Sequence, residues 1–218
     1  MKNERLSDSV YQYLLDMILN MEIKPGDRIP EAKIATQLGI SRTPIRDAML
    51  QLANDGIINI YPNRFAEVAC WDEERVKQIG VMRIQMDNLA VRLAVHYGSN
   101  AEFLQMFDHA ILCLEAAKAG DMVTRIKEDC AFHLELSVIS KNQYLIDFQR
   151  RNYLRIEFLQ SWRGGYLETP EEQYRQHEEL QEILMARDAK KACVFLTQHN
   201  MHFHNLEEEY PIGLFLDE

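Results

Sequence analysis

The N-terminal fold is decided by residues 39–52, which read Gly39-Ile40-Ser41-Arg42-Thr43-Pro44-Ile45-Arg46-Asp47-Ala48-Met49-Leu50-Gln51-Leu52. Gly39 suits the left-handed backbone conformation that often ends a helix. Ser41 or Thr43 can cap the helix that follows. Pro44 is tolerated in the first turn of that helix, because the amide hydrogen that proline lacks would have no intrahelical partner there. The stretch therefore predicts the turn and second helix of a helix-turn-helix.

The predicted second helix has an apolar face and a basic face. Its apolar residues recur at i, i+3, i+4 and i+7 and are Ile45, Ala48, Met49 and Leu52. Arg42 and Arg46 are four residues apart near the helix N-terminus, where a recognition helix places the side chains that read DNA bases. The planar fork of arginine can hold guanine O6 and N7, or a phosphate, through two hydrogen bonds. The alternative is an ordinary amphipathic surface helix with two solvated arginines.

The flanking sequence favours a winged helix. An apolar stripe from Leu6 to Met21 predicts a first helix, and Pro30-Glu31 can open a second. After the predicted recognition helix, two β-prone runs at residues 57–60 and 65–68 are joined by the turn residues Tyr61-Pro62-Asn63-Arg64. Three helices followed by a hairpin make a winged helix. Arg64 at the hairpin tip can then reach a neighbouring groove or phosphate.

The stretch from residue 25 to residue 68 resembles the GntR family of bacterial transcription regulators. The matching residues are Pro25-Gly26-Asp27-Arg28-Ile29, the run from Leu38 to Ala48, Leu52 and Asp55-Gly56. The resemblance implies that residues 1–70 form a DNA-binding domain. The residues expected to contact DNA are Arg28, Lys33, Ser41, Arg42, Thr43, Arg46 and Arg64. One departure concerns the wing's approach to DNA, since the family usually has a glycine where this chain has Phe65.

The charge of the chain is unevenly distributed. The 218 residues carry a net charge of −10, and a chain of this length favours two modest domains. Residues 1–70 contain 8 Lys and Arg against 9 Asp and Glu, whereas the remainder contains 16 against 25. The acidity therefore lies outside the predicted winged helix. Since the N-terminal part is not strongly basic, specific binding to double-stranded DNA must depend on a few placed arginines and on a homodimer at a palindromic operator.

The sequence also constrains the compartment. We expect no membrane contact, because no apolar run is long enough to span a bilayer and the N-terminus leads into no signal-peptide core. The cysteines are far apart, lack a CxxC spacing and sit beside apolar residues; they are Cys70, Cys113, Cys130 and Cys193. Buried, reduced thiols in a cytoplasmic protein fit this pattern better than a disulfide framework or a zinc ribbon.

From Trp71 onward the sequence predicts helices and no strands. Six are expected, beginning near Asp72, Asn100, Asp121, Tyr144, Thr169 and Asp188, and the last carries Phe203. Thr169-Pro170-Glu171-Glu172 is a capping box with proline at the first helical position. Short connections between six helices imply an antiparallel bundle, whose core is a natural place for a ligand or metal. The predicted fold class is thus mainly α, with an all-helical domain over residues 71–218.

Histidines in this bundle raise the question of a metal site. Asp129 and His133 are four residues apart on one helix, so their side chains share a face. His177 lies on the fifth predicted helix of the bundle and His199 on the sixth. Three imidazoles and a carboxylate can bind a divalent cation such as Zn, Ni or Mn. Without a family in mind, hydrogen-bonded core or surface histidines are the better interpretation.

The bundle, however, resembles the FCD domain, the ligand-binding domain of FadR-type GntR regulators. The matching residues are Asp129-Cys130-Ala131-Phe132-His133, Ser140-Lys141-Asn142, Gln176-His177-Glu178-Glu179-Leu180, the run from Ala186 to Ala192, and Gln198-His199. Metal-binding members of that family use one Asp and three His at matching positions. The resemblance therefore implies a divalent metal held by Asp129, His133, His177 and His199.

The same resemblance implies an effector site. Arg83 matches an arginine that points toward the effector pocket, where it can clamp a carboxylate, although a surface salt bridge is an alternative. The acidic residue usual four positions later appears here as Asp87, which can change the size of the pocket. Asn142 can bind the effector or cap a helix. We expect a small organic or sugar acid at or near the metal to control operator affinity.

Two other functions remain open from the sequence. One is a metal-responsive regulator in which the ion itself is the signal. The other is a metal-dependent hydrolase, because three His and one Asp with an open coordination position can activate water. Against a hydrolase, no candidate base or nucleophile stands out near the four residues, and no enzyme needs a winged helix.

Overall fold

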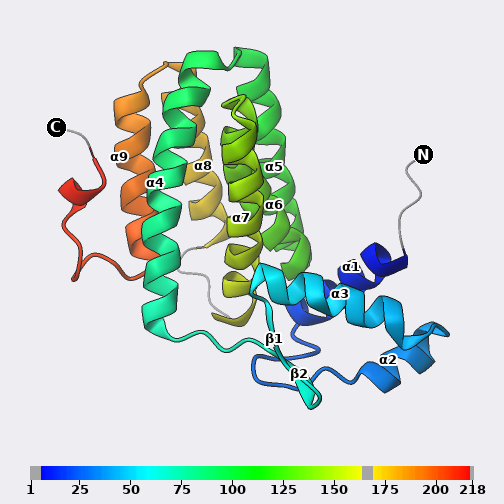
Figure 1. Ribbon diagram of the computed structural model, residues 1–218. Helices are drawn as coiled ribbons and strands as arrows, with labels where there is room; N and C mark the ends of the chain where they lie inside the picture. The colour runs from blue at the N-terminus through cyan, green and yellow to red at the C-terminus, as the bar shows by residue number, and fades with distance from the viewer. Residues whose placement is uncertain (1–5, 164–168, 217–218) are drawn as a thin grey trace. The chain divides into compact units, whose positions relative to one another are not determined.

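Figure 1 shows the computed structural model, which describes residues 6–163 and 169–216. The chain divides into two compact units. We call Met1–Cys70 with Glu157–Gly164 the winged-helix unit, and Trp71–Ile156 with Gly165–Glu218 the bundle unit. Helices make up most of the described residues, and the one sheet among them has two antiparallel strands. The mainly α fold class is therefore confirmed.

The winged-helix unit contains the predicted three helices and hairpin. Its elements are α1 (Leu6–Leu19), α2 (Glu31–Leu38), α3 (Arg42–Asp55), β1 (Ile58–Tyr61) and β2 (Phe65–Val68). The hairpin pairs Ile58 with Val68 and Tyr61 with Phe65. The first strand begins one residue later than predicted, because the Ile57 amide donates to the Leu52 carbonyl at 3.0 Å and so helps to close α3.

The turn before α3 has the expected backbone geometry. Gly39 is left-handed, with φ 65° and ψ 30°, and its amide donates to carbonyls near the end of α2. Ser41 occupies the N-cap position of α3 in an extended conformation, but its side chain makes no capping hydrogen bond. A left-handed glycine, Gly56, ends α3. Left-handed glycines thus end both α2 and α3, while the hydroxyl cap expected from Ser41 or Thr43 is not made by Ser41, and Thr43 lies inside α3.

The bundle unit contains the six predicted helices and one short element that the sequence did not predict. The helices are α4 (Glu73–Tyr97), α5 (Asn100–Ala119), α6 (Met122–Ile139), α7 (Gln143–Arg163), α8 (Pro170–Met185) and α9 (Ala189–Phe203). A 3₁₀ turn, Ile212–Leu214, follows. Helix α4 packs against α6 and α9, and α5 packs against α6 and α8. Figure 1 shows these helices side by side. The last residues of α7, from Glu157 onward, are assigned to the winged-helix unit.

Side-chain caps explain where most of the bundle helices begin. Ser99 and Thr169 form complete capping boxes with Glu102 and Glu172. Asp72, Asp121 and Asp188 cap α4, α6 and α9 by accepting from backbone amides three residues later. Each bond satisfies an amide that has no partner within its own helix. The helix starts are therefore local features of the sequence.

Two glycines allow close contacts in the bundle unit. A Cβ atom on Gly80 of α4 would lie 2.5 Å from Cβ and Cγ of His204. A Cβ atom on Gly98 would lie 2.4 Å from Ile139 Cγ2 and 2.6 Å from the Ala94 carbonyl oxygen. Gly98 has an ordinary negative φ of −75°, so glycine is needed here for space.

The cysteines differ from the expectation in one respect. Cys113, Cys130 and Cys193 are buried free thiols, as predicted, but Cys70 is exposed. Both sequence neighbours of Cys70, Ala69 and Trp71, are buried, so apolar neighbours along the chain do not by themselves bury this thiol. None of the described helices combines the length and hydropathy needed to cross a membrane.

Candidate nucleic-acid interface and metal centre

The exposed face of α3 carries the predicted base-reading residues. Ile45, Ala48, Met49 and Leu52 are buried on the other face. Arg42, Thr43 and Arg46 are exposed, together with Ser41 just before the helix. Arg46 Nε lies 3.3 Å from Glu31 Oε2, but the Arg46 side chain is 66% exposed. Because solvent screens such a pair, Arg46 remains accessible to a polyanion.

The wing presents a second basic side chain at its tip. Arg64 is exposed at the end of a turn in which its amide donates to the Tyr61 carbonyl at 3.0 Å. Asn63 in that turn has a positive φ of 59°, a conformation that asparagine tolerates better than most residues. The turn therefore holds Arg64 at the extremity of the hairpin.

Phe65, which replaces the expected glycine, organises the base of the wing. The guanidinium carbon of Arg28 lies 4.1 Å from the centre of the Phe65 ring. The Phe65 and Tyr61 rings are 4.8 Å apart. A cation stacked on an aromatic ring in this way is held in place while its polar edge stays exposed. Phe65 thus orders Arg28 and does not simply obstruct the approach of the wing to DNA. Lys33, another predicted DNA contact, is exposed on α2.

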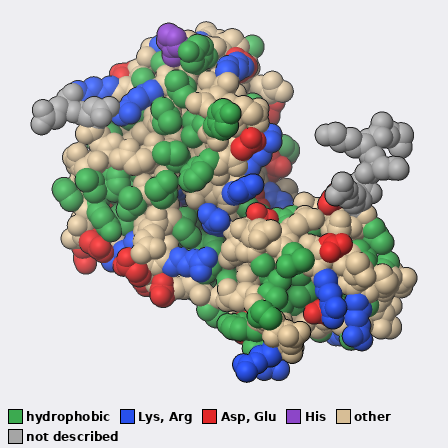
Figure 2. Space-filling model, viewed as in Figure 1, with side chains coloured by type: hydrophobic (Ala, Val, Ile, Leu, Met, Phe, Trp, Pro, Cys, Tyr) green, Lys and Arg blue, Asp and Glu red, His purple; other side chains and the backbone are tan. Residues whose placement is uncertain are grey.

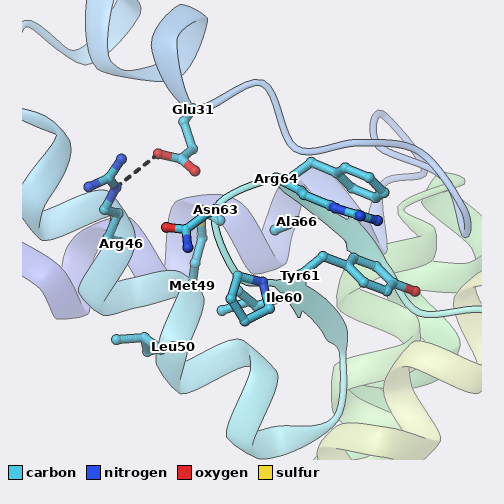
Figure 3. Close-up of a pocket in the computed structure, with 11 residues that line it drawn as sticks. Glu31, Arg46, Met49, Leu50, Ile60, Tyr61, Asn63, Arg64 and Ala66 are labelled. Atoms are coloured by element: carbon cyan, nitrogen blue, oxygen red, sulfur yellow. Dashed lines mark hydrogen bonds and ion pairs between the residues drawn. The ribbon is translucent and has the colours of Figure 1, made fainter.

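A groove separates the wing from α3. It has a volume of about 510 Å³ and is lined by Glu31, Arg46, Met49, Leu50 and the hairpin residues 60–66. Figure 3 shows Arg46 and Leu50 on successive turns of α3, across the groove from Asn63 and the wing. On the visible face of this unit, apolar side chains lie between Lys and Arg side chains (Figure 2). Two of the predicted DNA contacts, Arg46 and Arg64, line the groove, whereas the other five do not.

In the bundle unit, three of the four predicted metal ligands lie together. Asp129 and His133 on α6 and His177 on α8 are buried, and one donor atom from each lies within 4.8 Å of the others. His177 Nε2 is 3.3 Å from Asp129 Oδ1. The ring of His199, on α9, stacks on that of His133 at 5.8 Å between centroids, but it does not join the group of three at this distance.

Within the part of the chain that the structure describes, the imidazoles of this cluster make no hydrogen bond of ordinary geometry, although His177 Nε2 lies 3.3 Å from Asp129 Oδ1. Among the described residues, no hydrogen bond reaches either ring nitrogen of His133 or of His177. Buried polar atoms in proteins are nearly always hydrogen-bonded, so each exception needs an explanation. Imidazole nitrogens and a carboxylate oxygen that converge in a buried place are a donor set suited to a divalent cation. The residues present therefore fit the metal that the resemblance implies.

The protonation states also suit a metal. Burial and the nearby charge of Arg83 lower the pKa of His133 well below its ordinary value, and the same causes lower that of His199 to about 4. Burial alone would raise the pKa of Asp129, but contact with His177 and the nearby His133 and Arg125 side chains hold it well below its ordinary value. Neutral imidazoles and an ionised carboxylate are the forms that bind metals.

A polar relay that the sequence analysis did not predict fixes Asp129. Gln173 Nε2 donates to Asp129 Oδ1 at 2.6 Å, while Gln173 Oε1 accepts from Arg125 Nη2 at 2.8 Å. Because the NH₂ group of Gln173 donates to a carboxylate and its carbonyl oxygen accepts from a guanidinium, the orientation of the Gln173 amide is determined. Gln173 lies four residues before His177 on the same helix. That i, i+4 spacing is the one signal in the sequence that could have linked it to the cluster.

The predicted effector residues have other partners in this structure. Arg83 is buried rather than part of a surface salt bridge, and its Nε lies 3.4 Å from Asp87 Oδ2. Asp87 also accepts hydrogen bonds from Gln149, Tyr153 and Asn200 at 2.6, 2.8 and 3.0 Å. Asn142 Oδ1 accepts from the Leu145 amide at 3.2 Å and so caps the start of α7. The contacts of Asn142 are those of a helix cap.

Two stretches of the chain match known protein families. Residues 6–68 match the profile described as "Bacterial regulatory proteins, gntR family", and residues 78–202 match the profile of the FCD domain. The second match alone spans more than half of the chain. The chain belongs to the GntR family and carries an FCD domain. Both resemblances drawn from the sequence, including the FadR-type architecture, are thereby confirmed.

Individual GntR relatives agree with this assignment. The chain is 27% identical over 197 residues to the Nta operon transcriptional regulator of Aminobacter aminovorans, covering 88% of this chain and 90% of the relative. In fold it is similar to Escherichia coli McbR/YncC, with a TM-score of 0.76, 22% identity, and coverage of 94% of this chain and 100% of that one. A putative GntR regulator from Rhodococcus sp. RHA1 superposes with a TM-score of 0.78 at 18% identity, covering 94% and 99%.

These findings decide between the classes left open by the sequence. The chain is a DNA-binding transcriptional regulator of the GntR family, and not an enzyme, because its relatives are regulators along most of their length. At these identities the solved structures bear on the fold alone. The metal, the effector and the individual DNA contacts rest on the geometry of this chain.

Proposed function

We propose that this GntR regulator binds a palindromic operator as a homodimer through α3 and the wing, and that a divalent metal and a small carboxylate effector in the bundle unit control its affinity. The exposed strip of Ser41, Arg42, Thr43 and Arg46 supports the first part. These side chains stand at the N-terminal end of α3, which in helix-turn-helix proteins enters the major groove. Arg28, Lys33 and Arg64 would then supply contacts to the DNA backbone or the neighbouring groove.

The observation that carries the second part is the convergence of His133, His177 and Asp129 inside the bundle, where no ring nitrogen of the two histidines makes a hydrogen bond of ordinary geometry with a described residue. The cation, Zn, Ni or Mn, would supply a positive centre with open coordination positions for a carboxylate. Asp129 contributes the negative charge, held in place by Gln173. We assign His199 as the fourth ligand, on the strength of its neutral imidazole and its position beside His133.

Arg83 supplies a second positive charge at this place. Burial, and after it the charge of Arg83, lowers the pKa values of both His133 and His199, which accords with a guanidinium near the imidazoles. An organic or sugar acid that binds here would be attracted by Arg83 while its carboxylate completes the coordination. Because Asp87 already engages Arg83, the effector competes with Asp87 for the guanidinium or shares it. Asn142, which caps the start of α7, is the second effector candidate.

The coupling to DNA requires two arrangements of the protein. An effector shifts the population toward the arrangement that it binds more tightly, and operator affinity changes by the corresponding difference in binding energy. Symmetric operator half-sites require a dimer, which sets the spacing of the two α3 helices. A metal-responsive regulator, in which the cation alone produces this shift, is the second candidate and rests on the same cluster.

The test combines composition and binding. Native mass spectrometry of the purified full-length protein should show a dimer with one divalent cation per subunit. Gel retardation of DNA from upstream of its own gene is then measured with each acid of a library of small carboxylic acids. An acid should change the retardation only when the cation is present. The variants His133→Ala and His177→Ala should lose the cation, whereas His202→Ala should not, because His202 is exposed and paired with Glu207.

The remaining outcomes are informative as well. A response to Zn²⁺, Ni²⁺ or Mn²⁺ without any acid would select the metal-responsive candidate. Unchanged cation content in the His133 and His177 variants would refute the metal centre. If the wild-type protein and the Arg42→Ala variant retard DNA equally, the assignment of α3 as the recognition helix is refuted.

A further inference from the structure

The groove between α3 and the wing has an apolar wall that arginine-based recognition does not use. Among the described residues of the winged-helix unit, the exposed large apolar side chains are Leu6, Leu50, Ile60 and Tyr61. Three of these four line this one groove, and Leu50 is 55% exposed. Single exposed leucines are common and need no explanation. Three exposed apolar side chains at one groove, in contrast, call for an explanation.

Leu50 continues the exposed strip of α3. Arg42, Arg46 and Leu50 are spaced by four residues and all three are exposed, so they stand on successive turns of one side of the helix. Figure 3 shows Arg46 and Leu50 projecting from the same side of α3. The face opposite carries the buried core of the unit. A ligand that contacts both arginines therefore also meets the Leu50 side chain.

The chemistry of the strip identifies what Leu50 contacts. Its charges favour a polyanion, since Arg42 and Arg46 lie on it and Arg64 lines the other side of the groove. The apolar group that DNA offers on the base edges of the major groove is the C5 methyl of thymine. Four residues of helix rise by about 6 Å, close to two base-pair steps of about 3.4 Å.

We infer that Leu50 is a specificity-determining residue that contacts a thymine methyl, about two base pairs from the base pair contacted by Arg46. Ile60 and Tyr61 line the wing side of the same groove. This inference rests on the proposed use of α3 as the recognition helix. Its measurable consequence is that each operator half-site has one position at which thymine is preferred for its methyl group.

Thymine and uracil differ on this edge only by the methyl group, which makes the test direct. High-affinity duplexes are selected from a random-sequence library with the full-length protein. Each thymine of one selected duplex is then replaced singly by deoxyuridine, and dissociation constants are measured by fluorescence anisotropy. Burial of one methyl group corresponds to about fourfold in affinity, so replacement at the Leu50 position should weaken binding by about that factor per half-site.

A matched pair of variants separates this contact from a general effect. Leu50→Ala should bind the thymine and uracil duplexes equally at that position. Leu104→Ala should keep the wild-type preference, because Leu104 is also 55% exposed but lies on α5 of the bundle unit. Circular dichroism of both variants should match the wild type, because neither side chain belongs to a core.

Each contrary outcome overturns the inference in a distinguishable way. If no duplex is selected, the proposed DNA binding itself fails, and the inference with it. If duplexes are selected but Leu50→Ala keeps every thymine preference, the recognition helix stands and the Leu50 contact is wrong. If Leu50→Ala instead lowers the subunit count in sedimentation and leaves base preference unchanged, the groove is a contact between protein copies.

Discussion

Replacement of Asp87 by asparagine should destabilise the bundle unit strongly, because it leaves a buried charge without its partner. Asp87 and Arg83 are each 1% exposed, with 3.4 Å between Asp87 Oδ2 and Arg83 Nε. Both carboxylate oxygens of Asp87 also accept hydrogen bonds, from Gln149 and Tyr153 on one and Asn200 on the other. The amide of asparagine carries no charge, and its NH₂ group would face a donor.

The magnitude follows from these contacts. Breaking a buried ion pair by removing one partner costs about 3–5 kcal/mol of unfolding free energy. With a urea slope of about 3 kcal/mol per molar, the midpoint of unfolding of Asp87→Asn should fall by about 1–2 M. Far-UV circular dichroism follows the transition, since the bundle helices dominate the signal. The matched control is Asp147→Asn, an exposed aspartate whose pair with Arg150 is long at 3.9 Å, and it should change stability by less than about 0.5 kcal/mol.

A second background makes this prediction refutable. In Arg83→Met, the buried guanidinium beside Asp87 is gone, so adding Asp87→Asn should cost about 2 kcal/mol less than it does in the wild type. If Asp87→Asn costs less than about 1 kcal/mol, or costs the same in both backgrounds, the ion pair does not hold the bundle together as argued.

Three further predictions follow from the structure. Gly98→Ala should destabilise the protein by about 1–3 kcal/mol through overpacking, whereas Gly213→Ala, where an added Cβ meets nothing within 4 Å, should leave the melting temperature unchanged. Gln173→Leu should weaken Zn²⁺ binding at least about tenfold in isothermal titration calorimetry, because Asp129 loses the donor that orients it; equal affinity would show that the relay is dispensable. Arg64→Ala should reduce the slope of log affinity against log salt by about one if this exposed wing residue contacts a phosphate, and an unchanged slope would place it away from the DNA backbone.

Most of the secondary structure could be predicted from the sequence because its signals are local. The capping boxes at Ser99 and Thr169 lie within four residues of the helix starts that they define. The left-handed glycine at position 39 needs only its own backbone preference. The strand that begins at Ile58 was predicted one residue early, because the preceding amide closes α3 by a bond that the strand pattern does not reveal.

The candidate site could be predicted only in part. Asp129 and His133 share a helix face, and their proximity follows from the i, i+4 spacing. That His177 reaches them, and that His199 stacks beside His133 without joining the three, depends on the packing of α8 and α9. Arg83 and Asp87 are also four residues apart, so their pairing is visible in the sequence, but their complete burial is not.

The sequence by itself therefore determined where the helices and the hairpin lie, which family resemblance they support, and which side chains share a helix face. The tertiary structure decided which polar groups lose water and what replaces it. Gln173 reaches Asp129 across 44 residues of chain, and Asn200 reaches Asp87 across 113. Such hydrogen bonds, the loss of water around them and the gathering of Leu50, Ile60 and Tyr61 at one groove depend on distances between residues of different elements, which periodicity within one helix or strand does not reveal.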